Sequence, residues 1–186
     1  EMSKFIGLNI GCGACKLDNY INVDINIKHK PDVVFNIFKP FPILDNSFGQ
    51  VLLLHVIEHV PATLHANVLL ECRRILKDDG FILIAYPEFI KCATNYIENK
   101  FGKRDFWAAT IYGRQLTHDD YHVALMNTHD FIPLLEAIGY KDIVDKPEPF
   151  PLESHNTIVK AYKGTSALTR EDIIRDEIYD GRKKWD

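Results

Sequence analysis

The first 25 residues constrain the fold of this chain more than any other stretch. An apolar run of strand length, residues 5–10, leads into Gly11 and Gly13, and a second run, residues 20–25, carries the carboxylate of Asp24. Two glycines let the backbone approach a ligand closely, because no Cβ intervenes and a positive φ costs little. An acidic residue at the tip of the neighbouring parallel strand can accept hydrogen bonds from a ribose diol. The stretch therefore predicts a nucleotide-type ligand site.

The spacing within this stretch narrows the ligand. A dinucleotide fingerprint has a third glycine five residues after the first and an acidic residue about 20 residues further on. Here Lys16 stands at the third position, and Asp24 follows Gly11 by only 13 residues. That leaves little room for a full helix between the strands, so a pyrophosphate site at a helix N-terminus is disfavoured. A ligand with a ribose and no phosphate fits better, and S-adenosylmethionine is such a ligand.

The following residues predict an alternating order of strands and a helix. Strands are expected at 32–36, at 50–55 and, after a turn at 78–80, at 81–86. Pro61 suits the first turn of a helix, whose apolar stripe consists of Leu64, Val68, Leu69, Cys72, Ile75 and Leu76. Strand–helix–strand repetition predicts a right-handed parallel α/β sheet, in which ligands bind beyond the carboxyl ends of the strands. The residues expected at such ends are Gly11, Asp24, Asn36, His55 and Tyr86.

The second half of the chain is less regular. Residues 88–127 are rich in aromatics and histidines and are expected to form a helical or lid-like insertion on the acceptor side of the site. The remaining elements are expected as a helix at 130–138 ended by Gly139, two pairing strands at 141–145 and 155–162, and a charged helix at about 169–182 opened by a capping box. We expect one domain spanning residues 1–186.

Composition excludes some partners. The net charge is −4 over 186 residues, so nothing in the overall charge favours a duplex nucleic acid, which is bound through basic contacts. No apolar stretch has the roughly 18 residues needed to span a bilayer, and we expect neither a membrane partner nor a signal peptide. The four cysteines do not form a disulfide framework in a chain of this length, so the cytoplasm is the expected location.

In order and spacing, several segments resemble the class I S-adenosylmethionine-dependent methyltransferases, specifically the small type 11 group. The matching segments are residues 8–13, 20–24, 41–42, 45–48, 55–59 and 74–80. The resemblance extends over residues 5–90 and, loosely, over 105–145. It implies an α/β, Rossmann-like methyltransferase fold with a mostly parallel seven-stranded sheet, its last strand antiparallel and helices on both faces. It also implies S-adenosyl-L-methionine as the cofactor.

The resemblance further implies which residues contact the cofactor. They are the loop residues Gly11, Cys12 and Gly13, the strand-end residues Asp24 (ribose) and Ile25, Asn36 and Ile37 (adenine), and the pocket wall His55, Val56 and His59. The chain departs from the family pattern twice. Asn36 stands where relatives often carry Asp, although an amide oxygen can still accept from an adenine amino group. The helix that usually follows the glycine loop is cut short.

Two motifs suggest other chemistry. Cys12 and Cys15 have the Cys-x-x-Cys spacing of a redox pair, which needs a helix N-terminus to lower a thiol pKa, and no helix is expected there. His55–His59 matches the His-x-x-Glu-His pattern of inverzincin metalloproteases. That chemistry needs all five residues on one helix, whereas here a strand ends and Pro61 opens the helix afterwards. The pattern is instead expected to line the pocket, with Glu58 and His59 capping the helix, and we predict no metal site.

The acceptor side offers two candidate bases, His118 and His122. A histidine near its ordinary pKa can remove a proton from a hydroxyl or an amine during attack on the methyl group; a polar surface loop is the alternative reading. We predict methyl transfer to an oxygen or nitrogen of a small molecule or sugar unit. The alternatives are a non-catalytic cofactor-binding subunit, a nicotinamide oxidoreductase, which the missing third glycine disfavours, and a metalloprotease. The sequence does not indicate an oligomeric state.

Overall fold

The structure is a computed structural model that describes residues 5–100, 104–117, 120–145 and 155–165. The predicted C-terminal helix at 169–182 and the candidate base His118 lie outside these residues. The described strands are β1 Gly7–Ile10, β2 Tyr20–Asp24, β3 Val33–Val34, β4 Phe48–Leu54, β5 Leu76–Pro87, β6 Tyr140–Asp145 and β7 Asn156–Lys163. The described helices are α1 Ala62–Ile75, α2 Phe89–Ile97, α3 Arg104–Tyr112 and α4 Thr128–Ile138, with 3₁₀ turns η2 Ile27–His29 and η3 Ile57–His59.

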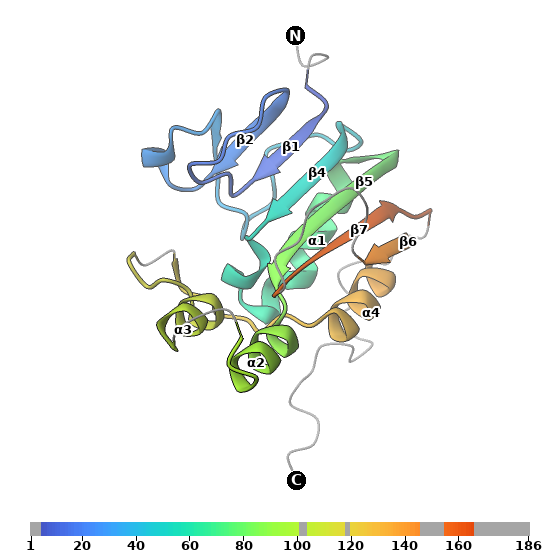
Figure 1. Ribbon diagram of the computed structural model, residues 1–186. Coiled ribbons are helices and arrows are strands. Elements are labelled where there is room, and N and C mark those ends of the chain that lie inside the picture. Colours follow the sequence, from blue (N-terminus) through green and yellow to red (C-terminus); the bar gives the residue numbers. More distant parts are fainter. Residues whose placement is uncertain (1–4, 101–103, 118–119, 146–154, 166–186) are drawn as a thin grey trace.

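The strands form one seven-stranded sheet in the order β3-β2-β1-β4-β5-β7-β6 (Figure 1). The first five strands pair in parallel, and β7 runs antiparallel to both β5 and β6. This confirms the predicted sheet and its antiparallel last strand. The carboxyl ends of β1, β2 and β4 therefore meet at one edge of the sheet, and α2 and α3 of the insertion lie beyond the ends of β4 and β5 (Figure 1).

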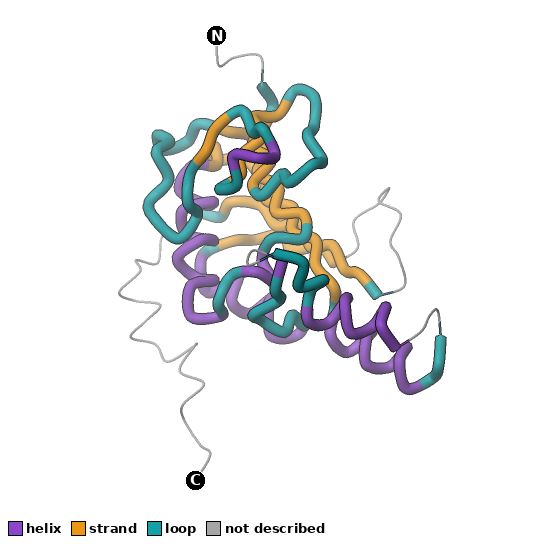
Figure 2. The backbone as a smooth tube through the Cα atoms, turned by 90° about the vertical axis from the view of Figure 1, so that its left-hand side faces the viewer, coloured by secondary structure: helices purple, strands orange, loops and turns teal. Residues whose placement is uncertain are grey.

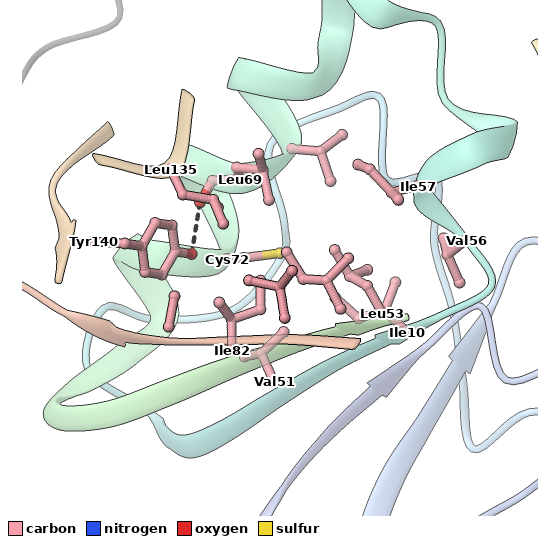
Figure 3. Close-up of a cluster of buried hydrophobic side chains, with 14 of the residues drawn as sticks. Ile10, Val51, Leu53, Val56, Ile57, Leu69, Cys72, Ile82, Leu135 and Tyr140 are labelled. Carbon is pink, nitrogen blue, oxygen red and sulfur yellow. Dashed lines mark hydrogen bonds between the residues drawn. The ribbon is translucent and has the colours of Figure 1, made fainter. Parts of the chain in front are cut away.

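One hydrophobic core lies between the sheet and its helices. Alternate residues of β1, β4 and β5, such as Ile10, Leu53 and Ile82, pack with residues of α1 and α4 (Figure 3). The predicted stripe of α1 is buried at Val68, Leu69, Cys72 and Ile75. Tyr140 joins the layers, because its hydroxyl donates to the carbonyl of Leu69 at 3.0 Å. Burial of alternate residues on parallel strands thus fixes which side of each strand faces the helices.

The helical cover differs between the two faces of the sheet. Within the described residues, α1 and α4 both belong to the core on one face, and the smaller cluster on the other face contains strand and loop residues only. Figure 2 shows the helices on one side of the strands and beyond their ends. Of the predicted helical cover on both faces, the described residues provide the cover on one face, and the predicted helix at 169–182 lies outside them. The short connections after β1 and β2 add no α-helix: residues 11–19 form turns with no helix, as the spacing predicted, and residues 25–32 hold only η2.

One strand boundary differs from expectation. The predicted turn at 78–80 lies inside β5, where the register with β4 shifts between Phe48 and Gln50. Residues 77–79 are exposed and bulge out of the ladder, so the chain passes from α1 into β5 through an irregularity in the strand. No helix among the described residues is both long and apolar enough to cross a membrane.

Candidate functional site

The glycine loop after β1 has two glycines with different constraints. Both have positive φ, 64° at Gly11 and 52° at Gly13. A Cβ added to Gly11 would lie 2.5 Å from Cγ2 of Val56, whereas a Cβ at Gly13 would meet nothing within 4 Å. Gly11 is therefore required by the packing of the loop against the segment after β4. Gly13 leaves bare backbone beside open space, as a close approach to a ligand requires.

Asp24 is connected directly to this loop. Its side chain lies at the end of β2 and the residue is 9% exposed. Oδ2 accepts a hydrogen bond from the backbone N–H of Gly13 at 2.8 Å, and Oδ1 accepts one from the N–H of Asn26 at 2.8 Å. These bonds fix the orientation of the carboxylate. Because each carboxylate oxygen can accept a second bond, Asp24 keeps capacity for a ligand's hydroxyls.

Asn22 is a site-supporting residue that the sequence did not reveal. It is 4% exposed in β2, and its Oδ1 accepts from the N–H of Leu17 at 2.8 Å and from Nδ2 of Asn9 at 3.0 Å. Its Nδ2 donates to Asp32 at 2.8 Å. These bonds anchor the loop that stands where the family usually has a helix. The sequence signal for such an anchor is a polar residue at an inward position of a strand.

The cysteine pair in the loop does not have the features of a redox site. Cys12 is buried and Cys15 is exposed, and both are free thiols. Burial raises the pKa of the Cys12 thiol, and the charge of Asp24 raises it further. A reactive thiol needs the opposite shift, and no helix follows the loop. Both observations disfavour redox chemistry at this pair of cysteines.

The predicted adenine-side residues lie around the ends of β2 and β3. Ile25 is exposed, and Ile37 packs on the core. Oδ1 of Asn36 accepts from the N–H of Phe38 at 2.8 Å and so closes a turn. One lone pair of the oxygen expected to contact adenine is therefore already occupied, and the other can still accept.

The segment after β4 is a strained turn, not a helix. His55 has φ 56°, its N–H donates to the carbonyl of Ala85 at 2.9 Å, and η3 follows at Ile57–His59. The five residues of the metalloprotease pattern are thus split between a strand end and a 3₁₀ turn, as predicted. The expected cap is not formed, since α1 has Pro61 at its N-cap and no side-chain cap bond. Glu58 is instead 1% exposed.

The insertion brings His122 to this turn, although His122 lies 63 residues after His59 in the chain. The carbonyl of Glu58 accepts from the N–H groups of Val123 at 2.9 Å and Ala124 at 3.2 Å. The rings of His59 and His122 meet edge to face with centroids 4.8 Å apart. Burial lowers the pKa of His122, an effect that the charge of Glu58 partly offsets. A neutral imidazole at pH 7 follows, which can accept a proton.

Beside this cluster lies a small cavity. Glu58 and His122 line the cavity together with residues of α2, α3 and the strand ends. Its volume, measured as the space open to the centre of a water molecule, is about 10 Å³. That is room for roughly one water molecule. Carboxylate, imidazole and cavity thus lie together at the edge of the sheet that also carries Gly11 and Asp24.

Comparison with known proteins finds a similarity over the first half of the chain. Residues 8–84 match the family model described as "Methyltransferase domain". This segment runs from β1 to β5 and contains both the glycine loop and Asp24. Over these residues the chain is similar to methyltransferase domains. The match covers somewhat less than half of the chain, and its residues are those that carried the resemblance to the type 11 group. The resemblance to that group implies S-adenosyl-L-methionine as the cofactor.

Solved methyltransferases share the fold of this chain at low sequence identity. A SAM-dependent methyltransferase from Archaeoglobus fulgidus is 17% identical, with a TM-score of 0.60 over 87% of this chain and 89% of that one. The N1-methyltransferase of 1,6-didemethyltoxoflavin from Burkholderia thailandensis, bound to S-adenosylhomocysteine, is 15% identical, with a TM-score of 0.54 over 85% and 70%. The CurJ carbon methyltransferase is 17% identical, with a TM-score of 0.61 over 88% of this chain, which spans about half of that one. No curated protein matches the sequence significantly.

The residues present fit the methyltransferase cofactor. Gly13 supplies backbone that a Cβ would otherwise cover, and Asp24 supplies a fixed, nearly buried carboxylate next to it. The short connection after β1 places no helix N-terminus where a pyrophosphate would bind. A ribose without a phosphate therefore suits this edge of the sheet.

Proposed function

We propose that this protein transfers the methyl group of S-adenosylmethionine to an oxygen or nitrogen of a small molecule or a sugar unit. The observation that carries the proposal is the bond from Gly13 N–H to Asp24 at 2.8 Å. It joins the two predicted cofactor-binding elements at one edge of the sheet. The acceptor side of the same edge carries Glu58, His59 and His122.

Each part of the site has a proposed task. Asp24 accepts hydrogen bonds from the ribose hydroxyls, and the backbone of Gly11, Cys12 and Gly13 supports the methionine part of the cofactor. Ile25, Asn36 and Ile37 contact the adenine, and His55, Val56 and His59 close the pocket from the end of β4. The cofactor's sulfonium makes its methyl group electrophilic, so the protein has to supply alignment and a base.

We propose His122 as the base. The insertion's backbone bonds to Glu58 hold it at the site, and burial lowers its pKa so that the ring is unprotonated at pH 7. His118 stays a prediction, because it lies outside the described residues. The free thiols Cys12, Cys15, Cys72 and Cys92 agree with a reducing cytoplasm.

Replacing Asp24 tests the cofactor part of the proposal. We expect Asp24→Ala to bind S-adenosylhomocysteine at least roughly tenfold more weakly, because hydrogen bonds to a charged acceptor contribute about 1.5–3 kcal/mol each. Isothermal titration calorimetry measures the affinity. Asp18→Ala, which removes an exposed carboxylate of the same loop, serves as the control and should bind as the wild type does. Unchanged affinity in Asp24→Ala would contradict the assignment.

A further inference from the structure

Glu58 has an unusual environment for a carboxylate. It is 1% exposed, and its Oε1 accepts from Nδ1 of His55 at 3.2 Å. Its Oε2 is buried and has no hydrogen-bond partner. A buried carboxylate oxygen without a partner is costly, so a group that occupies this position when the protein works would account for it.

His59 and His122 lie next to the carboxylate of Glu58. One ligand atom each from Glu58, His59 and His122 lie within 4.8 Å of one another. We propose that these three residues bind one divalent transition-metal ion. Two imidazoles and one carboxylate are a ligand set that suits zinc, iron and neighbouring metals, and three protein ligands leave coordination positions open. The proposal differs from the inverzincin pattern, because His122 from the insertion provides the second imidazole.

The hydrogen bonds around the cluster leave the ligand atoms available. Nδ1 of His59 lies 2.9 Å from the carbonyl of Tyr121, and a carbonyl can only accept, so Nδ1 carries the proton and Nε2 has a lone pair. Metal-binding histidines usually donate their other ring N–H to a backbone carbonyl or a carboxylate. The hydrogen bond from Nδ1 of His55 to Oε1 of Glu58 likewise fixes the orientation of the Glu58 carboxylate.

The geometry requires a modest contraction. Ligand atoms at about 2.0–2.2 Å from one ion lie roughly 3–4 Å apart, compared with up to 4.8 Å here. Rotation of the histidine side chains supplies a shift of this size. A cavity with room for about one water-sized sphere borders two of the three ligands, Glu58 and His122.

A metal ion at this position would narrow the type of methyl acceptor. This consequence rests on the proposed function. Coordination lowers the pKa of a hydroxyl on the acceptor, whose proton then leaves to solvent. The inference therefore favours an oxygen acceptor over a nitrogen one. In that case the lone pair of His122 would bind the ion, and His122 would act as a metal ligand and not as the base.

Metal binding can be measured on the untagged protein without any acceptor. After chelator treatment and dialysis, we expect the wild type to take up one Co²⁺ per chain with visible absorption bands, and Zn²⁺ to displace it. Glu58→Gln and His122→Ala should weaken binding by more than about 100-fold, beyond the roughly 10–100-fold cost of losing an outer partner. His129→Ala, an exposed histidine at the start of α4, should bind as the wild type does.

The outcomes separate this inference from the proposed function. Absence of the Co²⁺ bands in the wild type, or equal affinity in Glu58→Gln, His122→Ala and the wild type, would overturn the metal site. The wild-type measurement decides the question even where a variant fails to fold. Titrating the same samples with S-adenosylhomocysteine reads the cofactor pocket independently, so a protein that binds the cofactor and no metal retains the proposed function alone.

Discussion

The cofactor side and the acceptor side of the site are held together in different ways. On the cofactor side the decisive bonds are local: Gly13 to Asp24 and Asp24 to Asn26 span 11 and 2 residues. On the acceptor side, the bond from His59 to Tyr121 spans 62 residues. The hydrogen bonds of the cofactor side need only the pairing of β1 with β2. The hydrogen bond of the acceptor side needs the insertion to pack against the segment after β4. A change on the acceptor side should therefore leave cofactor binding intact.

The largest expected effect tests this independence at His122. His122→Ala should reduce turnover by about 10²–10⁴-fold if His122 acts as the base, because that is the usual contribution of a positioned base. If His122 instead holds the proposed ion together with Glu58 and His59, the same variant removes a ligand, so turnover should fall in either case. Its affinity for S-adenosylhomocysteine should match that of the wild type, since none of the Asp24 bonds involves the insertion. Release of S-adenosylhomocysteine with an acceptor that the wild type methylates gives turnover, and calorimetry gives affinity.

The exposed His129 provides the matched control for that comparison, and His129→Ala should retain full turnover. A His122→Ala variant that lost cofactor affinity in parallel with turnover would show that the two sides are coupled. Full turnover in His122→Ala would remove this histidine from the site altogether.

The two regions also differ in how far the sequence predicted them. The apolar runs located the strands, and the distance from Gly11 to Asp24 correctly predicted a connection without a helix. Spacing along the chain predicts this feature, because a connection of few residues between neighbouring parallel strands has no room for a helix. The meeting of Glu58 with His122 depends on docking of a segment distant in the chain, and no local pattern encodes that register. Glu58 was therefore expected to cap a helix, and the structure instead buries it.

The glycine loop offers the next largest effect, through two substitutions of the same kind. In Gly11→Ala the Cβ meets Val56 at 2.5 Å and the residue has a positive φ. We expect a loss of about 2–4 kcal/mol in the free energy of unfolding, from the strained backbone together with overpacking. In Gly13→Ala only the backbone cost of about 1–2 kcal/mol applies, because nothing lies within 4 Å of its Cβ. Urea denaturation measures both values.

Gly11→Ala should have the larger effect on stability, whereas Gly13→Ala should have the larger effect on cofactor affinity. Gly13→Ala places a methyl group in the open space proposed for the cofactor, so it should weaken S-adenosylhomocysteine binding out of proportion to its small effect on stability. If Gly13→Ala bound the cofactor as the wild type does, the open space beside Gly13 would not be the cofactor site.

The smallest effect concerns the anchor of the insertion at Glu88, the residue before α2. Its Oε2 accepts from Oγ1 of Thr157 at 2.7 Å and lies 2.9 Å from Nζ of Lys91. Burial alone would raise the pKa of Glu88, but hydrogen bonds from Lys91 and Thr157 outweigh it and lower the pKa to about 2. A carboxylate with a lowered pKa stabilises the fold fully above its ordinary pKa, and this contribution is lost as the pH falls towards 2.

Glu88→Gln should therefore be less stable than the wild type by roughly 1–3 kcal/mol at pH 7. The difference should shrink below about pH 4.5 and be lost as the pH falls through 2, because the wild-type carboxylate is then protonated too. Urea denaturation across this range measures it, with the exposed Glu136→Gln as the control. Since Glu88 holds the insertion and not the glycine loop, the Glu88→Gln variant should bind S-adenosylhomocysteine normally at pH 7. A stability difference that stayed constant with pH would show that the charge of Glu88 does not anchor the acceptor side.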